Sequence, residues 1–79
     1  MRDPRKDPRP GDKLKHGTQL IRITRRDLCG SIAGGAWIEF ALARTTTKRP
    51  RWEARGAPLG WWQGYDFVAN AEVLHVSAG

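Results

Sequence analysis

The side chains that could act as nucleophiles, acids or bases in this 79-residue chain lie in no catalytic pattern. Ser31 and Ser77 fall in an expected loop and an expected tail, without the histidine and carboxylate context that activates a serine. Glu39 and Glu53 could be cross-strand neighbours, but both lie on arginine-rich strands, where structural ion pairs account for them. We therefore expect a protein that is not an enzyme.

The single cysteine, Cys29, and the two histidines, His16 and His75, do not have the spacing of a zinc site. We therefore expect no metal and no other cofactor, and we interpret Cys29 as a small buried residue and His75 as structural. One cysteine excludes an intrachain disulfide, and no apolar leader or membrane-spanning run is present. These features predict a reduced, cytoplasmic protein.

Residues 28–35 contain three glycines, and a phosphate-binding loop is the most specific function that such a stretch could have. A phosphate-binding loop needs a lysine and a serine or threonine directly after its last glycine. Here Gly35 is followed by Ala36 and Trp37. We therefore predict a wide hairpin connection instead.

The net charge of +6 is unevenly placed along the chain. Residues 1–26 carry +6 and residues 44–55 carry +4, whereas residues 27–43 and 56–79 each carry −2. Clustered cations neutralise phosphates and release counterions, which favours a nucleic-acid backbone or an acidic protein surface as the partner. The cations predicted to form this binding surface are Lys13, Lys15, Arg22, Arg26, Lys48, Arg49 and Arg51.

Tryptophans supply a second candidate surface. Trp37 shares a strand face with Ala41 and Ala43, which leaves a shallow apolar floor that another segment or another chain should cover. We predict an apolar contact surface of Trp37, Trp61 and Trp62, with a homodimer through the Trp37/Ala41/Ala43 face as one outcome. Whether Trp61 and Trp62 are core or contact residues stays open. Trp37 and Trp52 lie on strands beside the basic segments, where an exposed tryptophan could stack a base, although Trp52 is expected in the core.

The strand that should position these residues spans 36–44, the longest apolar run of the chain. Both of its faces are largely apolar, which is typical of a strand covered on both sides. Alternating patterns predict further strands over 12–16, 19–26, 51–55 and 72–76.

On the strand at 19–26, Ile21 and Ile23 are expected inside, with Arg22, Thr24 and Arg26 on the opposite face. On the strand at 51–55, Trp52 and Ala54 are expected inside, with the charged residues outside. The full predicted core is Leu14, Ile21, Ile23, Ile38, Phe40, Leu42, Trp52, Leu74 and Val76.

An aromatic-rich segment at 61–70 separates the last two strands. Its spacing predicts a short helical turn, which Gly64 keeps short and which Asn70 ends in a left-handed conformation. Five strands with a helical turn before the last predict an all-β fold, an SH3-like small five-stranded barrel over residues 11–77. An OB barrel is the competitor, but its helix normally lies between strands three and four, where this chain has only a short connection.

Residues 1–10 form a Pro/Arg-rich arm in which Asp-Pro-Arg occurs twice, at 3–5 and 7–9. Its three prolines argue against a helix and favour extended backbone. We expect an extended arm laid on the barrel, with Asp3, Arg5, Asp7 and Arg9 pairing with the body. A disordered basic arm is the alternative.

The segment Asp-Pro-Arg-Lys-Asp-Pro-Arg-Pro-Gly-Asp at 3–12, together with Ala71-Glu72-Val73, resembles a group of short phage and prophage proteins. These proteins open on the same pattern and close with a tryptophan-containing turn before an Ala-Glu-Val strand. They commonly have glycine where this chain has Asn70. The resemblance covers the two ends, about 25 residues, and implies a setting in a bacterial host cell without implying a mechanism.

We therefore expect a small non-enzymatic phage or prophage binding module with a basic surface, for which nucleic acid is the preferred partner. The resemblance also implies an alternative. Small phage proteins often inhibit host machinery, so this chain would be an inhibitor or adaptor that docks on a host protein, such as a defence-system component, through the apolar tryptophan face.

Overall fold

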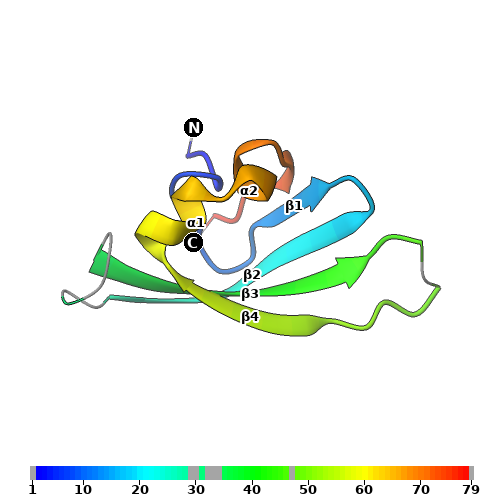
Figure 1. Cartoon of the computed structure of the whole chain (residues 1–79), viewed down its shortest axis with the longest axis horizontal. Helices are drawn as coiled ribbons and strands as arrows, with labels where there is room; N and C mark the ends of the chain where they lie inside the picture. Colours follow the sequence, from blue (N-terminus) through cyan, green and yellow to red (C-terminus); the bar gives the residue numbers. More distant parts are fainter. Residues whose placement is uncertain (1, 29–30, 32–34, 47, 79) are drawn as a thin grey trace.

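The computed structural model describes residues 2–28, 31, 35–46 and 48–78, which form one antiparallel sheet and two short helices (Figure 1). The strands are β1 (Lys13–His16), β2 (Gln19–Leu28), β3 (Ala36–Arg44), β4 (Glu53–Pro58) and β5 (Glu72–His75), and the helices are α1 (Leu59–Gly64) and α2 (Asp66–Ala69). The sheet order is β4-β3-β2-β1-β5. The prediction of five strands with a short helical segment before the last is confirmed, and the sheet is not closed.

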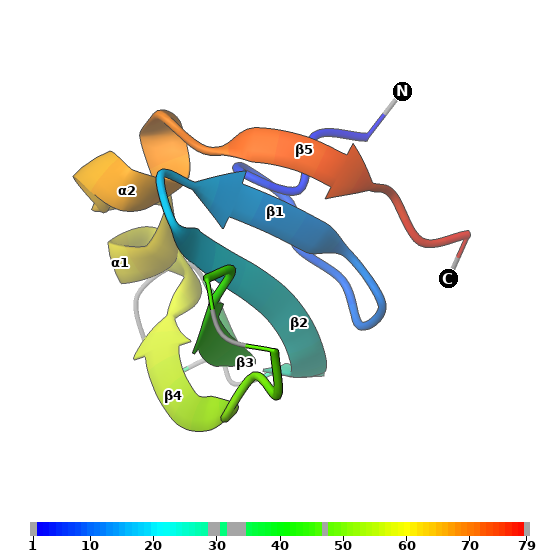
Figure 2. The same cartoon turned by 90° about the vertical axis from the view of Figure 1, so that its right-hand side faces the viewer.

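Both helices and the N-terminal segment lie on one side of the sheet, which we call the core face (Figure 1). The sheet curves around this layer from β4 to β5 (Figure 2). Side chains from alternate strand positions fill the space between, and the buried ones include Leu14, Ile21, Ile23, Ile38 and Phe40. These five predicted core residues are confirmed, because strand alternation places them all on the covered face.

Trp62 of α1 is the largest fully buried side chain of this core. Its ring meets Phe40 edge-on, with centroids 4.9 Å apart, and it meets Phe67 in the same manner at 6.5 Å. The prediction of Trp62 as part of a contact surface is therefore wrong. A large aromatic residue at the centre of a domain this small supplies much of its buried area.

Strand β3 lies between β2 and β4 and is largely buried on both faces, as its sequence predicts. Ile38 and Phe40 belong to the core. On the opposite face, which we call the open face, Ala41 and Ala43 are 6% and 5% exposed.

Two residues predicted in the core, Trp52 and Leu74, are instead 37% and 47% exposed. Ala54 is in register with Ala41, so Ala54 and Trp52 two residues earlier belong to the open face. On β5, Val73 pairs with Leu14 and packs on the core, so Leu74 points the other way. Side chains alternate between the two faces of the sheet as predicted in both segments, but the face assigned to the core is wrong. At the edges of a sheet, hydrophobicity alone does not identify the covered face.

Strand β2 does not keep one face from end to end. A register shift between Ile23 and Arg25 leaves Arg22 opposite Ala41 but Arg26 opposite the core residue Ile38. The prediction that Arg22, Thr24 and Arg26 share a face is therefore wrong. A bulge inserts one residue into the strand, and every side chain beyond it changes sides.

The predicted single helical turn is two short helices, α1 and α2, separated at Tyr65, whose φ of −72° and ψ of 132° are extended. Asn70 follows α2 with φ of −100° and ψ of 6°, so its predicted left-handed conformation is wrong. Its side-chain amide instead donates to the Asp66 carbonyl at 2.9 Å. In the described part of the chain, no helix is long and apolar enough to span a membrane.

The N-terminal segment packs on the core through its prolines. Pro4 and Pro8 are fully buried, and the indole N–H of Trp62 donates to the Pro4 carbonyl at 3.2 Å. The segment is not simply extended, because the N–H groups of Lys6 and Asp7 donate to the Asp3 carbonyl at 3.0 and 2.8 Å. Proline is well suited to the start of such a turn, where its missing N–H costs nothing.

Asp12 is fully buried and links the two ends of the chain. The Arg2 guanidinium donates to both carboxylate oxygens of Asp12, and its distance to Oδ1 is 2.8 Å. The backbone N–H groups of Arg9 and Ser77 donate to the same carboxylate at 2.8 and 2.7 Å. Arg2 also donates to the Ser77 carbonyl at 2.7 Å. A buried charge with a complete set of partners is tolerated, whereas one that loses a partner is costly.

Burial alone would raise the pKa of Asp12. The hydrogen bond from Arg2 and the backbone N–H groups of Ser77 and Arg9 outweigh burial, so the pKa of Asp12 is lowered. The hydrogen bond from Arg5 lowers the pKa of Asp3 in the same way. A lowered pKa in the folded state means that these carboxylates stabilise the fold above the unfolded pKa of about 3.9. That stability is lost as the pH falls through the folded value.

Replacement of the buried carboxylate tests this link. Asp12→Asn keeps the size of the side chain and removes its charge. We expect the free energy of unfolding at neutral pH to fall by about 3–5 kcal/mol, because Arg2 loses its counter-charge. The loss of stability below about pH 4 should also become shallower. Urea unfolding followed by circular dichroism across this pH range measures both effects.

Asp66→Asn is the matched control, because Asp66 is an exposed carboxylate with no ion pair among the described residues. It should leave the unfolding curve close to that of the wild type. Equal stability of Asp12→Asn and the wild type at neutral pH would contradict a structural role for the buried carboxylate.

Candidate functional site

Most carboxylates of the protein are engaged by arginine. The described ion pairs join Arg2 to Asp12, Arg5 to Asp3, Arg9 and Arg26 to Asp7, Arg25 to Asp27 and Glu39, and Arg55 to Glu53. Six arginines and six carboxylates take part in these ion pairs, so together they contribute no net charge.

The remaining eight lysines and arginines have no acidic partner among the described residues, and of the carboxylates only Asp66 and Glu72 are left. The whole net charge of +6 resides in these ten side chains. The unpaired cations are Lys6, Lys13, Lys15, Arg22, Arg44, Lys48, Arg49 and Arg51.

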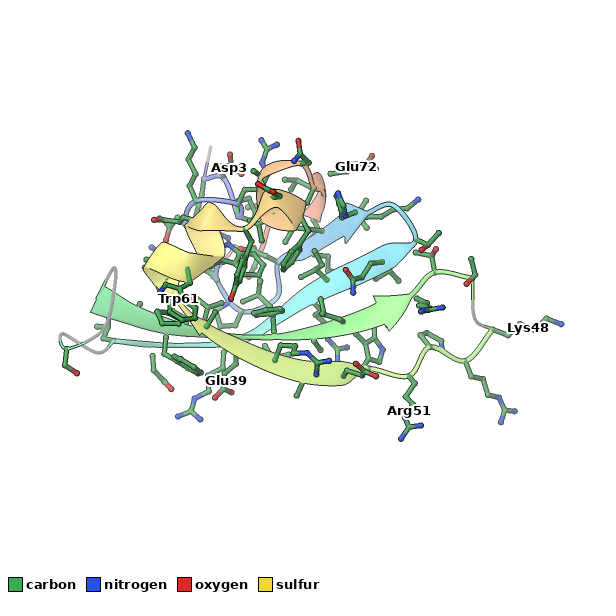
Figure 3. All side chains as sticks on the ribbon, viewed as in Figure 1. Asp3, Glu39, Lys48, Arg51, Trp61 and Glu72 are labelled. Atoms are coloured by element: carbon green, nitrogen blue, oxygen red, sulfur yellow. The ribbon has the colours of Figure 1, made fainter. Side chains whose placement is uncertain are left out.

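All of these cations except Lys6 lie on β1, on β2, or around the connection from β3 to β4. The β1–β2 turn and the end of β3 meet, because the Thr45 N–H donates to the Thr18 carbonyl at 2.7 Å. Figure 3 shows Lys48 and Arg51 pointing away from the body of the protein. We call the seven residues the basic end: Lys13, Lys15, Arg22, Arg44, Lys48, Arg49 and Arg51.

Cross-strand register sets two of these cations side by side on the open face. Lys13 pairs with Arg22, and Arg22 pairs in turn with Ala41. Both cations are exposed. Like charges directly opposite each other destabilise a sheet, so an anion bound between them would relieve their repulsion.

Arg22 also contacts Trp52, with its guanidinium carbon 4.5 Å from the ring centroid. Arg22 is on β2 and Trp52 directly precedes β4, so their contact passes over β3. Ala41 and Ala43 leave room for that contact, which accounts for their burial. The apolar floor predicted beside Trp37 is thus covered within the chain by Arg22 and Trp52.

Trp37 itself is partly buried, and its indole ring packs against Gly56 of the neighbouring strand. A Cβ atom at Gly56 would lie 2.5 Å from Cζ2 of Trp37. Trp61 on α1 is 63% exposed, whereas Trp62 is buried. The three tryptophans predicted to form one contact surface therefore have three different environments.

Arg26, the one predicted surface cation that is absent from the basic end, holds the N-terminal segment. Its guanidinium pairs with Asp7 and donates to the Pro8 carbonyl at 3.0 Å. The other predicted cations lie at the basic end, with Lys13, Arg22, Lys48, Arg49 and Arg51 exposed and Lys15 partly buried.

Three residues outside the predicted binding surface belong to this region: Arg44, Trp52 and Leu74. From the sequence, Trp52 was considered for base stacking but was expected in the core. Arg44 and Arg51 line a hollow of about 300 Å³ where β3 and β4 separate, together with Gln19 and Glu53. The signal in the sequence for Trp52 was its position directly after Arg51, at the end of the basic connection between β3 and β4. No pattern in the sequence indicated Leu74.

Within the described residues, no group of three or more His, Cys, Asp or Glu side chains could hold a metal ion. Cys29 and most of the glycine-punctuated stretch, 29–30 and 32–34, lie outside the described residues, so the predictions made for them stay predictions.

Comparisons of the chain with models of protein families, with curated proteins and with solved structures found no match.

The contact between Trp37 and Gly56 can be tested by adding one methyl group. Gly56→Ala should lower the free energy of unfolding by about 1–3 kcal/mol, because the new Cβ overlaps a rigid ring. The double variant Gly56→Ala/Trp37→Ala should lose less free energy of unfolding than the two single variants lose together, because the new Cβ no longer meets the Trp37 ring. Thermal unfolding of the three variants measures this coupling.

Gly64→Ala is the matched control, because a Cβ at Gly64 meets nothing within 4 Å. A Gly56→Ala protein as stable as the wild type would show that Trp37 does not lie on Gly56.

Proposed function

We propose that this protein is a small SH3-like binding module that holds the sugar–phosphate backbone of nucleic acid at its basic end. The observation that carries the proposal is the division of charge. Eight lysines and arginines have no acidic partner among the described residues, and seven of them lie at the basic end. A cation already held by a carboxylate has little to offer a phosphate. An unpaired cation releases counterions when it meets one, and this release supplies affinity.

The shape of the basic end favours a linear polyanion over a compact acidic ligand. Its cations are spread from the open face at Lys13 and Arg22 to the β3–β4 connection at Lys48, Arg49 and Arg51. A flexible chain of phosphates can follow such a path, whereas a single acidic group would meet only one or two of these cations. Affinity should therefore be mostly independent of sequence.

The SH3-like part of the proposal is supported by the strand order β4-β3-β2-β1-β5, with short helices before β5. The curvature of the sheet in Figure 2 brings its two edge strands around the same core layer. The non-enzymatic part is supported by Glu39 and Glu53, the two carboxylates considered for catalysis. They are not cross-strand neighbours, because Glu39 is in register with Gly56 and Glu53 with Leu42. Glu39 lies 4.0 Å from Arg25, and Glu53 lies 2.8 Å from Arg55.

A phage or prophage setting, in the cytoplasm of a bacterial host, is also part of the proposal and rests on the sequence resemblance. Pro4, Pro8 and Asp12, three residues of the shared pattern, are fully buried. Their burial gives the pattern a structural explanation that does not depend on the target. Members of such a group could share this fold and differ in the charges that they expose.

One observation favours a second candidate function. Trp61 is 63% exposed on α1, and exposed tryptophans are frequent anchors of protein interfaces. In this alternative the protein is an inhibitor or adaptor that docks on a host protein, for example a defence-system component. An absence of nucleic-acid binding at low salt would favour this candidate.

A salt titration tests the preferred function. Binding of a labelled DNA duplex, followed by fluorescence anisotropy, should weaken steeply as salt rises from about 50 to 200 mM. In Lys48→Ala/Arg49→Ala/Arg51→Ala the slope of log K against log salt should fall by about one for each lost phosphate contact.

Lys6→Ala/Arg9→Ala/Arg25→Ala is the matched control, since it also loses three positive charges, but away from the basic end. Its salt slope should stay close to that of the wild type. Equal slopes for the two triple variants would mean that net charge, and not the basic end, governs binding. No binding of the wild type at low salt would refute the proposed function.

A further inference from the structure

The open face carries a hollow that the electrostatic proposal does not use. It measures about 150 Å³ and is lined by Lys13, Leu20, Arg22, Trp52 and Leu74, among others. Trp52 and Leu74 are two of the four exposed large apolar side chains among the described residues, at 37% and 47%. A cavity of roughly this volume accommodates one aromatic ring.

The walls and the rim of the hollow differ in chemistry. Leu20, Trp52 and Leu74 supply apolar contact, while Lys13 and Arg22 bring positive charge to the same opening. The Arg22 guanidinium, 4.5 Å from the centroid of Trp52, covers one side of the ring and fixes its orientation. An occupant should therefore have a flat apolar part and a negative charge close to it.

An unpaired nucleotide has this combination, because a base offers a π-face and its phosphate lies a few bonds away. The bases of a duplex are stacked on one another and expose only their edges. A single strand can turn a base out against an aromatic side chain, a contact that tolerates any sequence.

We propose that the hollow beside Trp52 takes one base of a single-stranded nucleic acid, whose neighbouring phosphates lie on Lys13 and Arg22. This inference rests on the proposed function and narrows it from any nucleic acid to single strands. The basic connection at Lys48, Arg49 and Arg51 adjoins Trp52 in the chain and would hold the continuing backbone.

Three labelled probes of equal length separate base binding from phosphate binding: an oligothymidylate, an abasic strand with the same number of phosphates, and a DNA duplex. At low salt the wild type should bind the oligothymidylate about tenfold more tightly than the abasic strand, since one stacked base contributes roughly that factor. It should also prefer the oligothymidylate to the duplex. An oligouridylate in the same assay shows whether RNA serves equally well.

Trp52→Ala should remove the preference for bases and leave binding of the abasic strand unchanged. Trp52→Phe keeps an aromatic face with less disturbance of the fold, and it should retain part of the preference. Trp61→Ala is the matched control, because Trp61 is even more exposed but lies on α1. It should bind all probes as the wild type does.

The outcomes distinguish this inference from the function on which it rests. Equal binding of the oligothymidylate and the abasic strand, or tighter binding of the duplex, overturns the base-binding hollow and leaves the phosphate surface intact. No binding of any probe at low salt overturns both. A preference for bases that survives in Trp52→Ala but disappears in Trp61→Ala would move the site to α1 and contradict the inference.

Discussion

The buried carboxylate of Asp12 is the interaction on which the described structure most depends. It holds Arg2 and Ser77, which lie near opposite ends of the chain, at one point. The N-terminal segment that it fixes brings Pro4 against Trp62, and Trp62 in turn packs on Phe40 of the sheet. In a domain this small, a layer of this kind supplies buried area that five short strands could not provide alone.

Charge has two separate roles in this protein. Arginines paired with carboxylates build the fold, as Arg26 does when it holds Asp7. The other cations have no carboxylate partner among the described residues, and on the open face Lys13 and Arg22 repel each other across a strand pair. Natural sequences usually agree with their fold at each level, and local costs of this kind are typical of functional sites, which supports the binding role that we propose. The cation–π contact of Arg22 with Trp52 connects the charged and the aromatic parts of this site.

Alternation of apolar residues was sufficient to predict the five strands and their central core, because Ile21 and Phe40 lie where the period of two places them. The segments whose exposure depends on partners distant in sequence were not predictable. Trp52 directly precedes the edge strand β4, where either face could be the covered one. Arg26 follows a bulge that no local pattern marks, and the burial of Asp12 requires residues from both ends of the chain. Six of the seven cations of the basic end could be chosen from the sequence, with Arg44 as the exception, but the exposure of Trp52 among them could not be predicted.

The most direct test of this account is an NMR titration of the ¹⁵N-labelled protein with a short single-stranded oligonucleotide at low salt. We predict that the amide signals of Lys13, Arg22 and Arg51 and the indole N–H signal of Trp52 shift together, while those of the Trp61 indole N–H and the α1 amides do not. Shifts centred on α1, or no shifts anywhere at low salt, would contradict the claim that the unpaired charge marks a nucleic-acid surface.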